Sequence, residues 1–291
     1  MSIQSIMFNI MATKTDKKRD AAIPLPKGVT VCADIRYAPQ GKEEGLLDVY
    51  YPEGTAAQLP TIVSIHGGGF VYGTKAVYQR YCMDLARRGF AVVNFNYRLA
   101  PRSRFPAPLA DTNAVMAWIC ANAKEYHLDP DCIFLVGDSA GAQLASQYGA
   151  IYANAEYGKL FDFRIPTVRI RALGLNCGLY DCSKFLSFPW KSLERDYLGT
   201  KIPADDPRLF VLEAIGGNYP PAHITTASHD FLKDNAQPMC RLLQEKGIDA
   251  QWKCYEKPDG TELGHVFHVN ILLPEAVVCN DEQCAFFRRY L

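Results

Sequence analysis

Ser139 stands between two glycines, Gly137 and Gly141, directly after the apolar run 132–136 and before a run of small residues. The apolar run has the composition of a buried strand, and the small residues continue as a helix pattern. A Gly-x-Ser-x-Gly sequence at a strand-to-helix turn is typical of a nucleophile elbow, in which the serine hydroxyl projects above the sheet. A tight turn with a helix-capping serine is the alternative, so the interpretation depends on partners elsewhere in the chain.

The histidines are the candidates for a base, because a serine hydroxyl is a weak nucleophile and needs a partner with a pKa near ~6.5. His265 and His268 follow the last strand-like run. We expect His265 to be the base, since it comes first after a glycine-containing loop that can reach across the sheet edge, and His268 stays an alternative. His127 and His223 lie at the entrances of strands, which places them at the opposite end of the sheet.

A carboxylate is needed to hold the tautomer of the base. Asp230 closes a strand-like run directly before a helix, whereas Asp234 lies one turn later, where the helix dipole alone favours an acid. The chain order Ser139, Asp230, His265 is nucleophile, acid and base, which is the order expected of α/β-hydrolases. The sequence therefore predicts a Ser–His–Asp triad.

Backbone donors for a developing oxyanion are expected in the stretch HGGGF, residues 66–70, which follows the strand-like run PTIVSI. Successive glycines let N–H groups turn inward without obstruction by side chains. We expect Gly68, Gly69 and Ala140 to form the oxyanion hole, where losing one donor costs about 10²–10³ in rate. A glycine triplet is otherwise a flexible turn, and its place between a strand and a helix favours the catalytic role.

Several sequence blocks together resemble the hormone-sensitive-lipase-like family of α/β-hydrolase carboxylesterases: HGGGF, NYRLAPRSRFPAPLAD, GDSAG, HDFLKDN and GHVFHV, in that order. The resemblance implies the triad and oxyanion donors named above, no cofactor, and a shaping role for His66 in the glycine loop. Three positions depart from the usual family pattern, namely Asn96, Arg102 and Ala142. They bear on the subgroup and on loop packing, and leave the reaction class unchanged.

Strand-like apolar runs alternate with helix-like segments from residue 60 onward. This alternation predicts a mostly parallel, twisted sheet of about eight strands with helices on both faces. Runs 30–38 and 46–52 flank a Pro/Gly turn and predict an antiparallel hairpin at the sheet edge. The strand-like runs are 60–69, 90–99, 132–141, 169–178, 221–230 and 250–256, and the helix-like segments are 75–88, 107–126, 140–155, 235–247 and 275–289.

We expect residues 1–291 to form a single domain, with two segments that do not fit the alternation. These are residues 1 to about 28 and about 181 to 216, and we expect them to form a cap over the carboxyl edge of the sheet, because a long insertion in a compact domain is usually functional. Aromatic residues of the second segment either line an apolar pocket or only pack the cap: Phe185, Phe188, Trp190, Tyr197 and Phe210.

Composition excludes several classes of protein. The 31 basic residues are balanced by 31 acidic ones among 291 residues, so net charge attracts no nucleic acid. The 10 cysteines form no CxxC or zinc-ligand spacing, so we expect buried thiols and no metal site. No stretch reaches membrane-spanning length and the start lacks a secretory signal, which favours a cytoplasmic protein. A homodimer is a further expectation.

These observations predict a serine carboxylesterase that hydrolyses carboxylic esters through an acyl-enzyme on Ser139, without a cofactor. The family resemblance implies short- to medium-chain acyl groups. A peptidase or a carbohydrate deacetylase with the same triad is an alternative, since only the shape of the substrate pocket distinguishes these enzymes from an esterase. A non-catalytic small-molecule sensor on the same scaffold is a second alternative, although such proteins typically lack a triad member.

Overall fold

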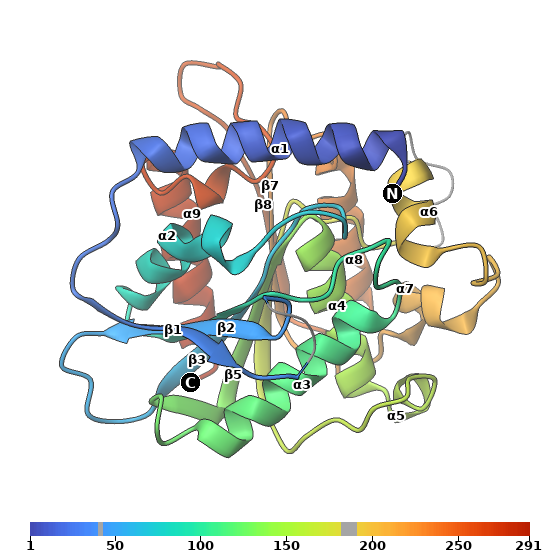
Figure 1. Ribbon diagram of the computed structural model, residues 1–291, viewed down its shortest axis with the longest axis horizontal. Coiled ribbons are helices and arrows are strands. Elements are labelled where there is room, and N and C mark those ends of the chain that lie inside the picture. Colours follow the sequence, from blue (N-terminus) through green and yellow to red (C-terminus); the bar gives the residue numbers. More distant parts are fainter. Residues whose placement is uncertain (40–42, 182–190) are drawn as a thin grey trace.

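An eight-stranded sheet forms the centre of the molecule (Figure 1), in the order β1-β2-β4-β3-β5-β6-β7-β8. The computed structural model describes residues 1–39, 43–181 and 191–291. The pairs β1–β2 and β2–β4 are antiparallel and the others parallel, which confirms the predicted sheet and its edge hairpin. The strands are β1 Val29–Arg36, β2 Leu46–Pro52, β3 Leu59–Ile65, β4 Ala91–Phe95, β5 Leu128–Asp138, β6 Ile170–Asn176, β7 Ala222–Ala227 and β8 Ala250–Tyr255.

Helices cover both faces of the sheet. Among the residues that the structure describes, no helix has both the length and the apolar character needed to cross a membrane. The α-helices are α1 Ile3–Ala22, α2 Lys75–Ala86, α3 Ala107–Asn122, α4 Ala140–Ala153, α5 Ala155–Gly158, α6 Lys191–Leu198, α7 Val211–Ala214, α8 Ala236–Glu245 and α9 Pro274–Arg288, and the 3-10 helices are η2 Pro207–Leu209, η3 Lys233–Asn235 and η4 Phe267–Val269.

Strand side chains alternate between two apolar layers. In β5, Ile133 and Leu135 pack in the layer that contains α3, α4 and α8, whereas Phe134 and Val136 pack in the layer that contains α2 and α9. Full burial of such a side chain contributes roughly 1.5–3 kcal/mol. Because both layers are apolar, the strands are continuous hydrophobic runs, which is why the sequence pattern predicted them.

Strand β5 begins earlier than the apolar run that predicted it. Its first residue, Leu128, pairs with Leu59 of β3, although the expected strand started at Cys132. Residues 129–131 are polar or proline, so the hydrophobic pattern marked only the buried part of the strand. The preceding helix α3 accordingly ends at Asn122, short of the expected 126.

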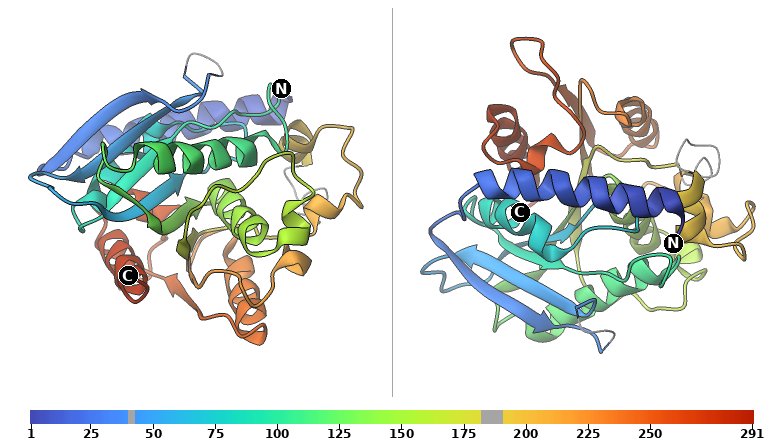
Figure 2. Two further views of the ribbon diagram at one scale, coloured as in Figure 1. Left: turned by 90° about the horizontal axis from the view of Figure 1, so that it is seen from below. Right: turned by 45° about the horizontal axis from the view of Figure 1, so that its top comes forward.

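The long helix α1 crosses the molecule beside α2 and reaches α6 (Figure 2). The backbone N–H of Ser2 and the hydroxyl of Ser5 both donate to the Asp196 carboxylate, at 2.6 and 2.7 Å. The side-chain amide of Asn9 donates to the carbonyl of Val71 at 3.3 Å, just after the glycine loop. The N-terminal segment is thus held against α6 and the glycine loop.

The second segment outside the alternation is described only in part. Residues 182–190, with the expected cap aromatics Phe185, Phe188 and Trp190, lie outside the described residues. Tyr197 of α6 is buried, and its ring stacks on Phe70 with centroids 3.8 Å apart and planes 4° from parallel. Tyr197 therefore packs α6 on the loop that follows the glycines, which is the packing role of the two roles expected for this residue.

Gly141 offers a direct test of how tightly α4 packs on β3. A Cβ at this position would lie 2.0 Å from the carbonyl oxygen of Ile65 and 2.7 Å from that of His66, and backbone atoms yield poorly. We expect Gly141→Ala to lower the free energy of unfolding by about 2–4 kcal/mol, measured by urea denaturation. Gly216→Ala is the control, because no atom lies within 4 Å of its Cβ. Equal stability of the two variants would contradict the packing described.

Candidate active site

Residues that follow the five parallel strands β3, β5, β6, β7 and β8 surround one cavity with a volume of about 680 Å³. Ser139 follows β5, the glycine loop 67–69 follows β3, and His265 follows β8, all in the cavity wall. Residues of α1 and α6 line the same cavity. We call it the central cavity. It lies where open α/β sheets place their ligand sites, outside the carboxyl ends of the strands.

Ser139 occupies a strained turn. Its φ of 52° and ψ of −117° lie in a region that residues other than glycine rarely adopt. Its N–H donates to the carbonyl of Asn176 in β6 at 2.9 Å, which anchors the turn to the sheet. A Cβ at Gly137 would lie 2.2 Å from the carbonyl oxygen of Gly141, so the flanking glycines are required by close backbone approach. This is the strand–turn–helix conformation of a nucleophile elbow.

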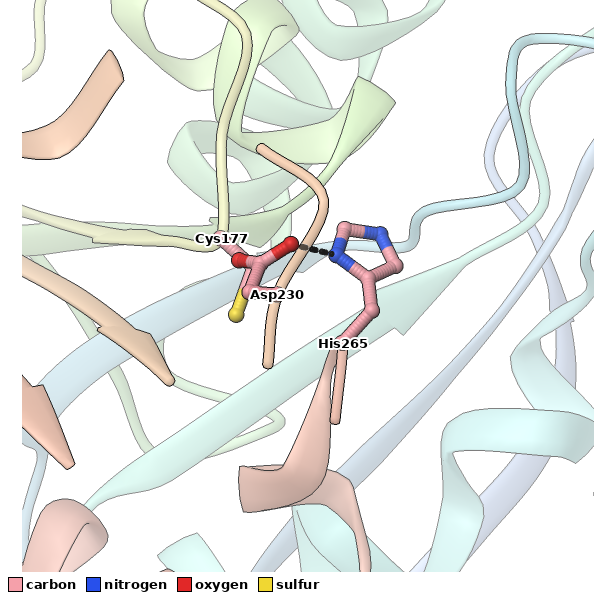
Figure 3. Close-up of side chains that lie close together, drawn as sticks. All are labelled: Cys177, Asp230 and His265. Carbon is pink, nitrogen blue, oxygen red and sulfur yellow. Dashed lines mark hydrogen bonds and ion pairs between the residues drawn. The ribbon is translucent and has the colours of Figure 1, made fainter. Parts of the chain in front are cut away.

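Asp230 and His265 form a hydrogen-bonded pair (Figure 3). The Nδ1 of His265 lies 2.7 Å from Oδ1 of the buried Asp230, which also accepts from the N–H of Leu232 and the hydroxyl of Thr226, each at 2.9 Å. Burial alone would raise the pKa of Asp230, but the hydrogen bond and charge of His265 outweigh it and hold this pKa below its ordinary value. An ionised carboxylate only accepts, so Nδ1 carries the proton and Nε2 remains an acceptor.

The structure brings Asp230 and His265 into contact and places Ser139 in the wall of the same cavity. The contact between the described side chains of Ser139 and His265 is not formed. No hydrogen bond joins the side chains of Ser139 and His265 within the described ranges. Catalytic hydrogen bonds are often long in unliganded sites and tighten when substrate binds.

Of the histidines described, His265 is the one in the wall of the central cavity. His268 is fully buried beside Tyr81, and burial lowers its pKa to about 3. His66 is buried and stacks on Tyr97 with centroids 4.1 Å apart, and burial lowers its pKa to about 4. The Nδ1 of His66 lies 2.8 Å from the Gly67 carbonyl, so this ring braces the glycine loop.

The glycine loop, residues 67–69, lines the cavity. Gly68 and Gly69 have φ values of 117° and 58°, and a Cβ at Gly68 would lie 2.1 Å from the carbonyl oxygen of Tyr72. The N–H groups of Gly68, Gly69 and Ala140 donate no hydrogen bond to any described residue. Free donors beside a nucleophile are suited to stabilise a negative oxygen that develops there.

A buried link between the glycine loop and the serine turn was missed in the sequence. The N–H of Gly67 donates to the hydroxyl of Tyr78 at 3.0 Å, and this hydroxyl donates to the carboxyl of Asp138 at 2.7 Å. Burial raises the pKa of Asp138 to about 7. Asp138 was visible as the neighbour of Ser139, but no motif marks Tyr78 as its partner.

Cys177 lies behind Asp230 (Figure 3), in a left-handed conformation with φ of 50° after β6. Donor atoms of Cys177, Asp230 and His265 all lie within 4.8 Å of one another, which is a possible metal-ligand set. Burial raises the pKa of the Cys177 thiol well above its ordinary range, and metals bind the thiolate. His265 Nδ1 is also engaged with Asp230, so the chemistry of the donor set favours a proton-transfer pair over a metal centre.

Comparison with known proteins gives concordant matches. A family model for the alpha/beta hydrolase fold matches residues 62–269. The chain is 29% identical over 252 residues to an acetyl esterase of Salmonella schwarzengrund, covering 81% of this chain and 70% of that enzyme. A crystal structure of inhibited esterase B from Lactobacillus rhamnosis superposes with a TM-score of 0.91 at 26% identity, covering 99% of this chain and 97% of that one.

A viral relative, described as a putative alpha/beta hydrolase of Acanthamoeba polyphaga mimivirus, is 26% identical over 207 residues. That match covers 68% of this chain but only 59% of the viral protein, so the chain spans about six tenths of that relative's length. The similarity to esterase B, in contrast, extends over nearly the whole of both chains.

The raised pKa of Asp138 predicts that the stability of the protein depends on pH. The carboxyl of Asp138 binds a proton more tightly in the folded protein than in the unfolded chain, because its pKa rises from 3.8 to about 7 on folding. This contribution is therefore present below about pH 4 and is lost as pH rises through 7. Relative to Asp138→Asn, the wild type should lose about 2–4 kcal/mol of unfolding free energy between pH 4 and pH 8, measured by urea denaturation.

Asp131→Asn is the matched control, since Asp131 is an exposed aspartate of the same strand. Its stability should follow the wild type across the pH range. Parallel curves for Asp138→Asn and the wild type would show that burial of Asp138 does not control its protonation.

Proposed function

The chain belongs to the hormone-sensitive-lipase-like family of α/β-hydrolase carboxylesterases, and we propose that Ser139, Asp230 and His265 are its catalytic triad. The observation that carries the proposal is the 2.7 Å contact between Asp230 and His265 at the wall that also holds the strained Ser139. The N–H groups of Gly68, Gly69 and Ala140, which donate to no described residue, support an oxyanion hole at the same wall.

The proposed reaction proceeds in two halves through an acyl-enzyme. The Ser139 oxygen attacks the ester carbonyl while Nε2 of His265 takes its proton, and the tetrahedral oxyanion accepts hydrogen bonds from the backbone donors. His265 then returns the proton to the leaving alcohol as the C–O bond breaks. Water repeats the sequence on the acyl-enzyme, releasing the acid and restoring the serine hydroxyl. Asp230 keeps the imidazole oriented and stabilises its charged form.

We propose short- to medium-chain carboxylic esters as substrates. The Salmonella relative is an acetyl esterase, and esterase B has also been crystallised with a tributyrin phosphonate, at 27% identity to this chain. In this chain α1 and α6 border the cavity, and we propose that segments 1–28 and 181–216 act as a cap that limits acyl length. The apolar side chains Met7, Met11 and Leu179 line the cavity, in keeping with an apolar substrate.

The cellular setting is a further part of the proposal. The cysteines in the described part of the chain are free thiols, which supports a reducing compartment such as the cytoplasm. Assembly as a homodimer stays a prediction, which light scattering on the purified protein tests.

Replacing the nucleophile tests the triad. We expect Ser139→Ala to lower kcat/KM for p-nitrophenyl acetate by at least about 10³, because the acyl-enzyme can no longer form. A fluorophosphonate probe should label the wild type at Ser139, detected by peptide mass spectrometry, and should leave the variant unlabelled. Full activity of Ser139→Ala, or labelling at another serine, would contradict the assignment.

An acyl-chain series tests the substrate class. For p-nitrophenyl esters from acetate to palmitate, we expect kcat/KM to be highest between acetate and octanoate and to fall with longer chains. The reason is that α1 and α6 border the cavity and limit its length. A maximum at palmitate would reject short- to medium-chain specificity while leaving the triad in place.

A further inference from the structure

Glu194 is a buried carboxyl group that the proposed reaction does not use. It belongs to α6, lines the central cavity together with Ser139 and His265, and is 5% exposed. Its Oε2 atom is buried and has no hydrogen-bond partner among the residues that the structure describes. Burial raises the pKa of Glu194 to about 8. A buried polar group without a partner is unfavourable, so a ligand group that pairs with this carboxyl would be stabilised there.

Acidic side chains outnumber arginine and lysine side chains in the described wall of the cavity, where Asp16, Asp138 and Glu194 accompany Arg19. Among the described lining residues Arg19 of α1 is the one arginine or lysine, and it forms an ion pair with Asp16 at 2.9 Å. Asp138 and Glu194 have no cationic partner within 4.0 Å in the part of the chain that the structure describes. Lys191, on the same helix, is exposed and forms no ion pair with Glu194, and although its charge lowers the pKa of Glu194, burial outweighs that effect. A ligand that brings a positive charge would restore the balance.

Aromatic rings form much of the remaining wall. Phe8, Tyr72 and Phe231 line the cavity, with Phe8 edge-on to Tyr72 at a centroid distance of 6.3 Å. The ring of Phe231 lies 4.3 Å from that of His265. Aromatic faces attract cations, and quaternary ammonium groups are the ligands most often held by several such rings. The combination of aromatic walls with an unpaired carboxyl is therefore suited to an ammonium group.

We propose that the central cavity selects carboxylic esters whose alcohol part carries an ammonium group, with Glu194 as the counter-charge. The proposal rests on the proposed esterase function. The ammonium group belongs to the alcohol part because the acyl part is proposed to be short. Glu194 acts as a specificity-determining residue that contacts the substrate away from the reacting carbonyl.

Matched ester pairs test this inference. The charged substrates are acetate esters of trimethylammonio alcohols with two, four or six methylene groups between oxygen and nitrogen, and in the neutral partners a carbon atom replaces the nitrogen. At pH 9, for at least one spacer, we expect the wild type to favour the charged ester by about tenfold in kcat/KM, which corresponds to about 1.4 kcal/mol. Glu194→Gln should reduce this ratio to near one, whereas Glu194→Asp, which keeps the charge, should retain part of it.

Glu156→Gln is the matched control, because Glu156 is an exposed glutamate on α5 whose side chain is 82% accessible. It should leave the ratio of charged to neutral ester unchanged. Circular dichroism and thermal unfolding report whether each Glu194 variant is folded, so a lost preference is separable from a lost structure.

The pH dependence gives a second readout. The trimethylammonium group does not titrate, and the pKa of Glu194 near 8 means that its carboxyl becomes ionised as pH rises through that value. The preference for the charged ester should therefore increase between pH 6.5 and pH 9 in the wild type and stay flat in Glu194→Gln. The neutral ester corrects for titration of other groups in the site.

Two outcomes would overturn the inference: a ratio near one in the wild type at every spacer, or an unchanged ratio in Glu194→Gln. Failure of the esterase function itself has a different signature, namely that neither member of any pair is hydrolysed and that Ser139 does not react with the fluorophosphonate probe.

Discussion

The close packing of backbone on backbone where β5 turns into α4 is the constraint on which the site depends. Gly137 and Gly141 approach each other and the end of β3 at distances that no Cβ would allow. This contact forces Ser139 into its left-handed conformation, and the bond from its N–H to Asn176 holds it there. The strain is maintained because the sheet and the helix are both buried, so relaxation would open the core.

The same sheet edge gathers the remaining groups because parallel strands end together. The glycine loop follows β3, Asp230 follows β7 and His265 follows β8, so residues far apart in the chain meet beside Ser139. Burial then gives the three carboxyl groups different properties. Asp230 is held ionised by His265, whereas burial raises the pKa values of Asp138 and Glu194, since neither carboxyl forms an ion pair with a described residue that would offset it. Environment rather than residue type assigns their roles.

The hydrophobic pattern predicted the sheet, and the reactive residue types at the ends of the strand-like runs predicted the candidate triad. Both faces of the sheet are covered, so its strands are continuous apolar runs, and reactive groups at strand ends have one edge to occupy. Helix α1 was not foreseen as a helix: it leaves Ile3 and Ile10 exposed, and so has no apolar stripe of the usual kind. The role of Tyr78 rests on its hydrogen bond to Asp138, which is 60 residues away in the chain, so no local sequence pattern predicts it.

A crystal structure of the protein treated with a short-chain alkyl phosphonate would test the central claim most directly, because the phosphonate imitates the tetrahedral intermediate. We predict a covalent bond from phosphorus to the Ser139 oxygen, with the phosphoryl oxygen within hydrogen-bond distance of the Gly68, Gly69 and Ala140 N–H groups and His265 Nε2 facing the ester oxygen. Attachment at another residue, or a phosphoryl oxygen turned away from those three donors, would contradict the account.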